Sequence, residues 1–308
     1  AYPWLKDPSL LPENYQSALG TLRSTEKVLR KDASWANIYN DQIVDMVNRN
    51  VARKLSPDEL SAWNGPVFYI SHLAVRNPKS QSTPVRIVFN SSQVVKGVSL
   101  NSFLAKGPDA YLNSIPGILL RWRENPVALI GDIKKMYNSI YVGEVEQHAH
   151  RFLWRNLEER TPDVYVICRV NMGDRPASAI STEAIYLTAD RFKEEYPMVS
   201  TLLRHSTYVD DIVDSFDSAD LAKQVACDTS HVLKQAGFTI KHWLSSGDST
   251  PRADLSIEAS PSSEDVDSVT AVLGVPWHSS SDSIVFIPKL NFSKKSKSVY
   301  TEIGRAHV

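Results

Sequence analysis

Apolar residues recur at helical spacing through the first sixty residues of the chain. Residues 13–31 place them three or four positions apart, and Pro12 stands where a helix would begin. Residues 36–54 repeat this spacing, and Ser56 is followed by Pro57 and two acids, which is typical of a helix start. We therefore expect two amphipathic helices over 13–31 and 36–54, and a short third helix after Ser56.

Strand-like patterns follow. Residues 67–75 and 84–89 are rich in branched and aromatic residues and are separated by a segment rich in Pro, Ser and Gln. They predict two paired strands. Residues 111–123 return to helical spacing.

The second half of the chain alternates strand and helix patterns. In chain order these are strand 126–132, helix 143–157, strand 164–170, helix 177–194, a hairpin over 203–215 with Asp210 and Asp211 at its turn, helix 218–236 ended by Gly237, and strand 238–243. A polar segment over 245–268 predicts a loop, and two further strands are expected near 270–275 and 283–287. This order predicts an α+β fold built on an antiparallel sheet backed by helices.

Composition narrows the class of protein. The chain has 308 residues, 42% of them apolar, which is enough for two or three subdomains with a sizeable core. The formal net charge is −1, so any surface that binds nucleic acid must be a local basic track. Two cysteines give no disulfide framework, and no run of 18 apolar residues is present. We expect a soluble, intracellular protein without a membrane partner.

Three aspartates stand inside apolar strand patterns. Asp132 lies in the run Val127–Ile133, and Asp210 and Asp211 lie in Tyr208–Val213. Buried carboxylates are costly without a positive partner, and neither run contains Lys or Arg. An aspartate pair at a hairpin is by itself ordinary turn chemistry. Together with Asp132, the pair predicts a two-metal site for phosphoryl transfer, because Mg²⁺ prefers carboxylate and phosphate oxygens.

Other phosphate-binding and catalytic motifs are missing from the sequence. It has no Gly-x-x-x-x-Gly-Lys loop and no Gly-x-Gly-x-x-Gly turn. It has no His-x-x-x-His spacing for zinc and no Gly-x-Ser-x-Gly elbow for a serine hydrolase. Phosphate chemistry in this chain would depend on the acids and a metal.

Seven segments, in order over about residues 1–290, resemble reverse transcriptases, most closely those of BEL/Pao-type long-terminal-repeat retrotransposons. They are Leu11–Tyr15, Arg86–Ser92, Gly131–Tyr137, Met172–Pro176, Tyr208–Asp211, Ala236–Trp243 and Val272–Trp277. The resemblance implies a right-hand polymerase with a helical N-terminal region (1–62), fingers (63–125), a palm with the catalytic motifs (126–244), and a polar loop with a primer-grip-like hairpin (245–301).

The resemblance also implies roles for the acids. Asp132 and Asp210 match the carboxylates that hold two Mg²⁺ ions, with Mn²⁺ as the alternative metal. Asp211 matches the second acid of the family's turn, and the backbone carbonyl of Ile133 is an expected further metal ligand. Lys241 is the expected general acid for pyrophosphate.

The nucleotide and primer contacts are implied in the same way. Arg86 takes the position that holds the incoming triphosphate, and Tyr137 the position of the ring that excludes a 2′-hydroxyl. The segment containing Met172 and Gly173 is expected beside the nucleotide and template. Leu273 and Gly274 are expected to contact the primer end. The sequence departs from the family at Asn90, where many relatives carry aspartate, and at Met172, where glutamine is common.

The expected activity is therefore RNA-directed DNA synthesis on a primer paired with an RNA or DNA template, using deoxynucleoside triphosphates. The expected context is a Pol polyprotein with RNase H and integrase, in the cytoplasm or in virus-like particles. Two alternatives stay open. An RNA-dependent RNA polymerase could use the same palm, although the ring of Tyr137 argues against it. An inactive or domesticated remnant could only bind nucleic acid, although the intact acids argue against it.

The C-terminal end carries two expectations. Residues 302–308 resemble an in-frame translation of a sequencing adaptor, so we expect a non-native tail there. No segment after Pro288 supplies a thumb, so we expect this fragment to extend primers poorly or to be inactive.

Overall fold

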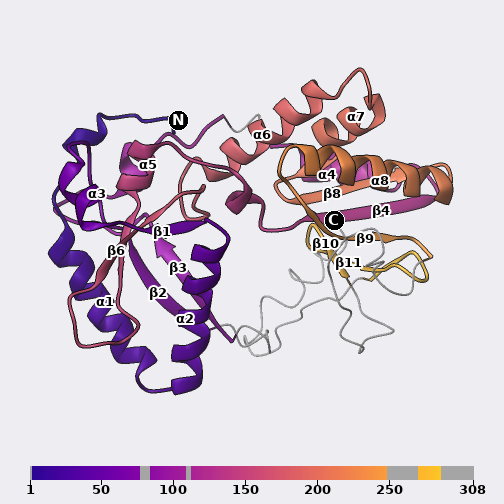
Figure 1. The fold of residues 1–308 in the computed structure, drawn as a ribbon. Helices are drawn as coiled ribbons and strands as arrows, with labels where there is room; N and C mark the ends of the chain where they lie inside the picture. Colours follow the sequence, from indigo (N-terminus) through magenta and orange to yellow (C-terminus); the bar gives the residue numbers. More distant parts are fainter. Residues whose placement is uncertain (1, 77–83, 109–111, 248–269, 286–308) are drawn as a thin grey trace, which may run out of the picture.

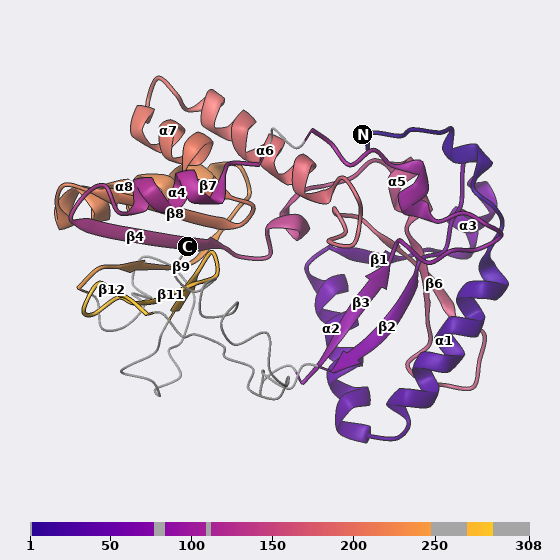
Figure 2. The same ribbon diagram turned by 180° about the vertical axis from the view of Figure 1, so that it is seen from behind.

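The elements of the fold gather into two groups that lie side by side, each with its own buried core (Figure 1; Figure 2). The structure is a computed structural model that describes residues 2–76, 84–108, 112–247 and 270–285. The expected turn between the first two strands, the polar loop beyond Gly247, the tail and most of the segment after Ile284 lie outside the described residues.

The first group combines helices with two small antiparallel sheets. Its α-helices are α1 (Tyr15–Leu29), α2 (Ala33–Asn48), α3 (Pro57–Ala62) and α5 (Glu144–Ala149). Strands β2 (Ser71–Arg76) and β3 (Val85–Asn90) form one sheet, and the other has the order β1 (Ala52–Lys54), β6 (Asp163–Ile167), β5 (Arg151–Trp154). The third helix begins as expected, because Ser56 and Glu59 form a reciprocal capping box.

Two helices predicted in this group were too long. The second helix ends at Asn48, because Asn50 turns the backbone to a φ of 54° and residues 52–54 pair with β6. The helix expected over 143–157 ends at Ala149, and all four residues of β5 that follow are buried. A short run dominated by apolar residues fits a helix or a buried strand equally well, and pairing with β6 decides for the strand.

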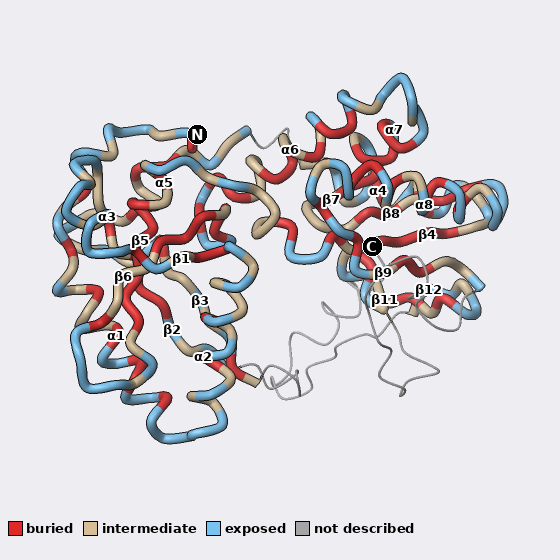
Figure 3. Tube along the Cα trace, viewed as in Figure 1, coloured by how far each residue is buried: buried red, intermediate tan, exposed pale blue. Residues whose placement is uncertain are grey.

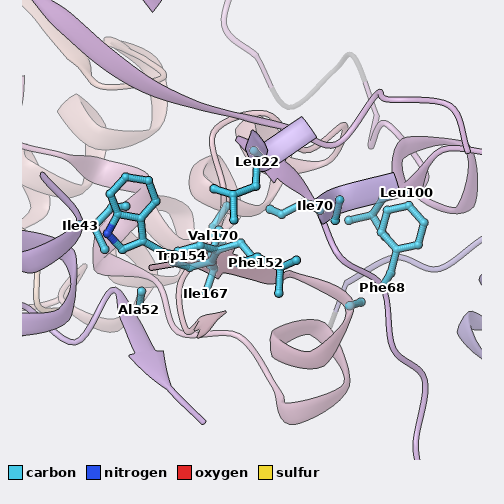
Figure 4. Close-up of a cluster of buried hydrophobic side chains, with 14 of the residues drawn as sticks. Leu22, Ile43, Ala52, Phe68, Ile70, Leu100, Phe152, Trp154, Ile167 and Val170 are labelled. Atoms are coloured by element: carbon cyan, nitrogen blue, oxygen red, sulfur yellow. The ribbon is translucent and has the colours of Figure 1, made fainter. Parts of the chain in front are cut away.

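The core of the first group joins its helices to both sheets. Figure 4 shows part of this cluster, with side chains from α1, α2 and β5 meeting. The labelled members are Leu22, Ile43, Ala52, Phe68, Ile70, Leu100, Phe152, Trp154, Ile167 and Val170. At its edge, the buried Glu26 of α1 accepts two hydrogen bonds from Arg155, at 2.7 and 2.6 Å.

The second group is a four-stranded antiparallel sheet covered by helices. The strand order is β7 (Thr207–Tyr208), β8 (Asp211–Phe216), β4 (Val127–Ile133), β9 (Ile240–Ser245). Helices α6 (Ala177–Arg191), α7 (Pro197–His205) and α8 (Ala219–Gln235) pack on one face. Figure 3 shows that β4 is buried along most of its length. The predicted α+β class, with an antiparallel sheet backed by helices, is confirmed.

A second buried cluster forms on the other face of this sheet. It contains Trp122 of α4 (Ile115–Trp122) and Trp277 of a small three-stranded sheet, whose rings meet edge to face 5.2 Å apart. That small sheet consists of β10 (Thr270–Val272), β11 (Val275–His278) and β12 (Ser283–Ile284).

One element of the second group was predicted wrongly. Residues 203–205 were expected in a hairpin strand but form the last turn of α7. This helix begins at Pro197, and proline favours the first position of a helix. The first strand of the hairpin is therefore only Thr207–Tyr208. The stop of α8 at Gly237 is as expected, with a φ of 84°. Within the described part of the chain, none of the helices combines the length and apolarity needed to cross a bilayer.

Candidate active site

Antiparallel pairing brings the three sequence-predicted acids to one end of the four-stranded sheet. Asp132 on β4 stands directly opposite Asp211 on β8. Side chains of directly opposed residues share a face, with Cβ atoms about 4.5–5.5 Å apart. The backbone N–H of Ile133 donates to the carbonyl of Asp210 at 2.8 Å, which holds the hairpin turn against the end of β4. Acids almost eighty residues apart in the chain are thereby neighbours.

The turn that carries Asp210 has only two residues. Tyr208 pairs with Asp211, so Val209 and Asp210 alone connect β7 to β8. Val209 has a φ of 55°, a conformation that normally requires glycine at the first position of such a turn. Its side chain packs on the buried cluster of the helical face, and this packing holds a conformation that costs about 1–3 kcal/mol.

Side chains alternate between the two faces of β4, and this alternation decides which face carries Asp132, one residue before the end of the strand. Ala128 and Ile130 pack on the same face as Asp132, within the cluster around Trp122. Gly131 points to the helical face, where a Cβ would lie only 2.5 Å from the ring of Trp243. Glycine thus lets Trp243 lie across β4 next to the site.

Burial and mutual charge repulsion disfavour the ionised forms of the clustered acids. Burial raises the pKa of Asp211 to about 6, and the charges of Asp210 and Asp132 add to the rise. Burial also raises the pKa of Asp210, with a further contribution from Asp132, while Lys241 acts in the opposite direction. Such a site favours a proton or a cation over three bare negative charges.

The donor set fits a hard divalent cation, since it consists of carboxylate oxygens. Among the described residues, however, no three His, Cys, Asp or Glu side chains are arranged around a common metal position. Mg²⁺ is commonly held by one or two carboxylates plus substrate phosphates and water. Asp132 with Asp210 or Asp211 could supply the protein's share of such a shell.

Two residues of β9 also belong to this end of the sheet. Lys241 is exposed, and its charge reaches Asp210. His242 stands opposite Asp132 on the side away from Asp211. Burial and Lys241 lower the pKa of His242, and Asp132 opposes that change. The sequence alone did not place His242 beside Asp132, because the pairing of β9 with β4 joins segments that lie far apart in the chain.

Tyr137 lies close to the acids. It belongs to a 3-10 helix (Met136–Ser139) directly after β4, and its hydroxyl is 3.3 Å from the Oγ of Ser178 on α6. Burial raises the pKa of Tyr137, and the nearby Asp210 contributes to the rise.

Three of the residues expected to bind nucleotide line one pocket of about 700 Å³. Arg86 comes from β3, and Met172 and Gly173 come from the turn before α6. Lys135 also lines the pocket, and its Nζ lies 3.4 Å from a carboxylate oxygen of Asp45. Tyr137 and the three acids are not among its lining residues. The structure therefore separates an acidic end of the sheet from a pocket with basic side chains.

The segment Met172–Pro176 does not lie wholly beside that pocket. Met172 is 77% exposed at the tip of the turn, whereas Asp174 is only 5% exposed. Asp174 turns away from the pocket, because its carboxylate accepts buried hydrogen bonds from Tyr2 and Ser91.

Leu273 and Gly274 form the two-residue turn between β10 and β11. Their φ angles are 48° and 89°, and two positive values are typical of a type I′ hairpin. Leu273 packs in the same cluster as Tyr208, the residue that precedes the acidic turn. The hairpin expected to hold a primer end therefore lies on the Tyr208 side of the sheet.

Comparison with known proteins gives only distant structural matches. No protein-family model matches the chain, and no curated protein matches it in sequence. The native protease-reverse transcriptase of prototype foamy virus aligns over 67% of this chain and 24% of its own, with 17% identity and a TM-score of 0.48. The foamy viral enzyme in complex with an RNA/DNA hybrid aligns over 64% of this chain and 22% of its own, with 18% identity and a TM-score of 0.45. The chain spans about a quarter of the length of these structures.

Proposed function

We propose that the chain is the fingers and palm of a reverse transcriptase of the BEL/Pao type, which adds deoxynucleotides to a primer by two-metal phosphoryl transfer. The observation that carries the proposal is the register that sets Asp132 opposite Asp211, with the Asp210 carbonyl bonded to Ile133. The parent protein is then a Pol polyprotein with RNase H and integrase, acting in the cytoplasm or in virus-like particles.

The acids have distinct roles in this proposal. Asp132 and Asp210 hold the metals, with the Ile133 carbonyl as a further ligand, and Asp211 adds negative charge from the facing strand. When bound, Mg²⁺ would favour the ionised 3′-hydroxyl of the primer and neutralise charge on the triphosphate. The raised pKa values of Asp210 and Asp211 fit this role, since a cation relieves the repulsion that raises them.

The remaining residues position the substrates. Arg86 is exposed at the pocket and holds the triphosphate through its planar fork. Tyr137, beside Asp210, excludes a 2′-hydroxyl. Met172 and Gly173 contact the nucleotide.

The other end of the reaction is assigned to two further groups. Lys241 protonates the leaving pyrophosphate. This role is supported by the effect of the Lys241 charge on Asp210, which places the ammonium group near the acids. Leu273 and Gly274 hold the primer end, next to the cluster that contains Tyr208.

Primer extension on an RNA template with Mg²⁺ and deoxynucleotides tests the proposal. We expect Asp132→Asn and Asp210→Asn to lower the rate about 10²–10³-fold or more, the scale expected when a group that stabilises transition-state charge is removed. Asp214→Asn is the matched control, because Asp214 lies on the same strand opposite Leu129, away from the acidic end. Its activity should stay within about twofold.

Three outcomes would contradict the proposal. Full activity of the Asp132 and Asp210 variants would remove the assigned roles. Incorporation of ribonucleotides by the unmutated chain would favour an RNA polymerase on the same fold. Binding of template and primer without any nucleotide incorporation would favour an inactive remnant.

A further inference from the structure

A buried charged network lies behind the turn that lines the pocket. At its centre is Asp174, which directly follows Gly173 and is 5% exposed. Its carboxylate accepts four hydrogen bonds from side chains that belong to four separate places in the chain. The donors are Tyr2 Oη at 2.6 Å, Ser91 Oγ at 2.6 Å, His150 Nε2 at 2.9 Å and Asn171 Nδ2 at 2.9 Å.

The partner of Asp174 in this network is a charged histidine. His150 is 1% exposed, and its two ring nitrogens face acceptors. Nδ1 lies 2.6 Å from the backbone carbonyl of Glu146, and Nε2 lies 2.9 Å from Asp174. A carbonyl cannot donate, and neither can an ionised carboxylate, so this geometry suits an imidazole that carries hydrogen on both ring nitrogens, which is the cationic form.

The pKa shifts agree with this geometry. Burial acts to lower the pKa of His150, but the charge and hydrogen bond of Asp174, together with Glu146, raise it overall. Burial acts to raise the pKa of Asp174, but His150 and the hydrogen bonds from Ser91 and Tyr2 lower it overall. The other groups that face the His150 ring are Tyr2, which meets it edge to face at 5.6 Å, and the Glu146 side chain, which accepts from the Tyr2 N–H.

The network is tied to the shape of the turn from Asn171 to Arg175. A Cβ on Gly173 would lie 2.7 Å from the carbonyl oxygen of Phe89, so the turn sits directly against the end of β3. On the solvent side, the Asn101 side chain donates to the Gly173 carbonyl at 3.0 Å and accepts from the Arg175 N–H at 2.8 Å. On the buried side, the hydrogen bonds of the Asp174 carboxylate hold the turn.

We propose that Asp174, paired with the cationic His150, is a positioning residue that holds Met172 and Gly173 at the pocket and so sets its affinity for a nucleoside triphosphate. This role rests on the proposed function of the same pocket, but neither Asp174 nor His150 touches the nucleotide. A buried ion pair is weak evidence for stability, because apolar residues of similar volume often serve as well. Here the charge lies under a turn whose exposed tip, Met172, lines the pocket.

The first experiment compares nucleotide binding and amide exchange in Asp174→Asn with the unmutated chain. We expect the Kd for dATP with Mg²⁺ to rise about tenfold, and the amides of Gly173 and Arg175 to exchange at least tenfold faster. Tyr39→Phe is the matched control, because it removes another buried side-chain hydrogen bond, to His72 at 2.6 Å, from the same core. It should leave both quantities within twofold.

The second experiment uses pH. The pKa of His150 is raised, so the ion pair is complete below about pH 6.5, the ordinary value for histidine, and is lost as pH rises through the folded-state pKa. The Kd for dATP should rise several-fold across that higher window. His150→Gln can still donate to Asp174 but does not titrate, so its Kd should lack this step, while titration of the triphosphate itself affects both proteins equally.

The outcomes separate this role from the proposed function. If Asp174→Asn changes turn exchange and dATP affinity no more than Tyr39→Phe does, or if His150→Gln keeps the pH step, the positioning role is overturned. If the unmutated chain binds no dATP, the proposed function fails, and amide exchange of the turn alone decides whether Asp174 positions it. Should Asp174→Asn not fold, Ser91→Ala removes one donor and keeps the ion pair, and we expect a threefold effect in the same direction.

Discussion

At the scale of single residues, the crowded carboxylates should make the free chain less stable as they ionise. An aspartate in an unfolded chain ionises near pH 3.9, whereas the folded-state pKa of Asp211 is about 6. The folded state therefore holds the proton more tightly, and its stability falls as pH rises from about 4 to about 6. We predict that Asp211→Asn removes this fall and melts at a higher temperature than the unmutated chain at pH 7.

Melting curves between pH 4.5 and 7.5, with and without millimolar Mg²⁺, check this prediction. Mg²⁺ should raise the melting temperature of the unmutated chain at pH 7 and have less effect on Asp211→Asn. Asp214→Asn serves as the control, with a pH dependence equal to that of the unmutated chain. Identical curves for Asp211→Asn and the unmutated chain would show that the three acids do not interact as described.

The sequence predicted individual residues well where their local surroundings were decisive. Asp132 could be recognised because it is an acid inside an apolar run, Val127–Ile133, that contains no Lys or Arg. The positions of His242 and Asp174 could not be predicted, since they depend on long-range geometry. The antiparallel pairing of β9 with β4 sets His242 beside Asp132. Donors from residues 2, 91 and 150 draw Asp174 inward, and no local pattern contains that information.

At the scale of elements, both hairpins near the site have a bulky apolar residue where a turn normally has glycine or asparagine. Val209 and Leu273 adopt positive φ angles of 55° and 48°. Local strain of this kind persists only when surrounding packing holds it, and it is enriched at functional sites. Each of these side chains packs on a buried cluster, so the apolar contact compensates for the turn.

We predict that Leu273→Asn separates folding from binding. Asn-Gly is the preferred pair for a type I′ turn, so relief of strain should offset the lost packing and keep the free energy of unfolding within about 1 kcal/mol. If Leu273 contacts the primer, affinity for a primer-template duplex should fall several-fold. Leu119→Asn is the control, because Leu119 packs in the same cluster but lies on α4. It should lower stability without weakening duplex binding specifically.

Fluorescence anisotropy of a labelled duplex and chemical denaturation measure the two effects. A Leu273→Asn variant that binds the duplex as well as the unmutated chain would remove the primer contact from the proposal.

The predicted elements were most accurate for long amphipathic helices, such as α1 and α8. They were wrong for β5 and for the start of the hairpin at α7, because cross-strand pairing and a proline-started helix decided those short segments.

At the scale of the whole molecule, the two groups of elements have separate cores that share few residues. Ile140 is the one partly buried residue assigned to both clusters among the described residues. The chain nevertheless passes between the groups three times, since β3 belongs to the first group, β4 to the second, β5 and β6 to the first again, and α6 to the second. This raises the question of whether the groups unfold together or separately.

The ion pair between the buried Glu26 and the partly buried Arg155 can answer that question, because it lies wholly in the first group. Glu26 is 1% exposed, and each of its two carboxylate oxygens accepts a hydrogen bond from the Arg155 guanidinium. Glu26→Gln leaves the partly buried Arg155 guanidinium without its charge partner, at a cost below the roughly 3–5 kcal/mol of a fully buried pair. Glu158→Gln is the control, since its partner Arg160 and Glu158 itself are both exposed, and such pairs contribute about 0–1 kcal/mol.

Because the cores are separate, we predict that Glu26→Gln speeds amide exchange strongly in β2, β5 and β6 and changes it less than twofold in β4, β8 and β9. The acidic end of the sheet would then keep its geometry while the pocket walls contributed by β3 loosen. Catalysis and nucleotide binding would fail at different temperatures, with binding lost first. Equal acceleration of amide exchange in both groups would instead mean that the molecule unfolds as one cooperative unit. The pocket and the acidic end of the sheet would then lose their structure at the same temperature.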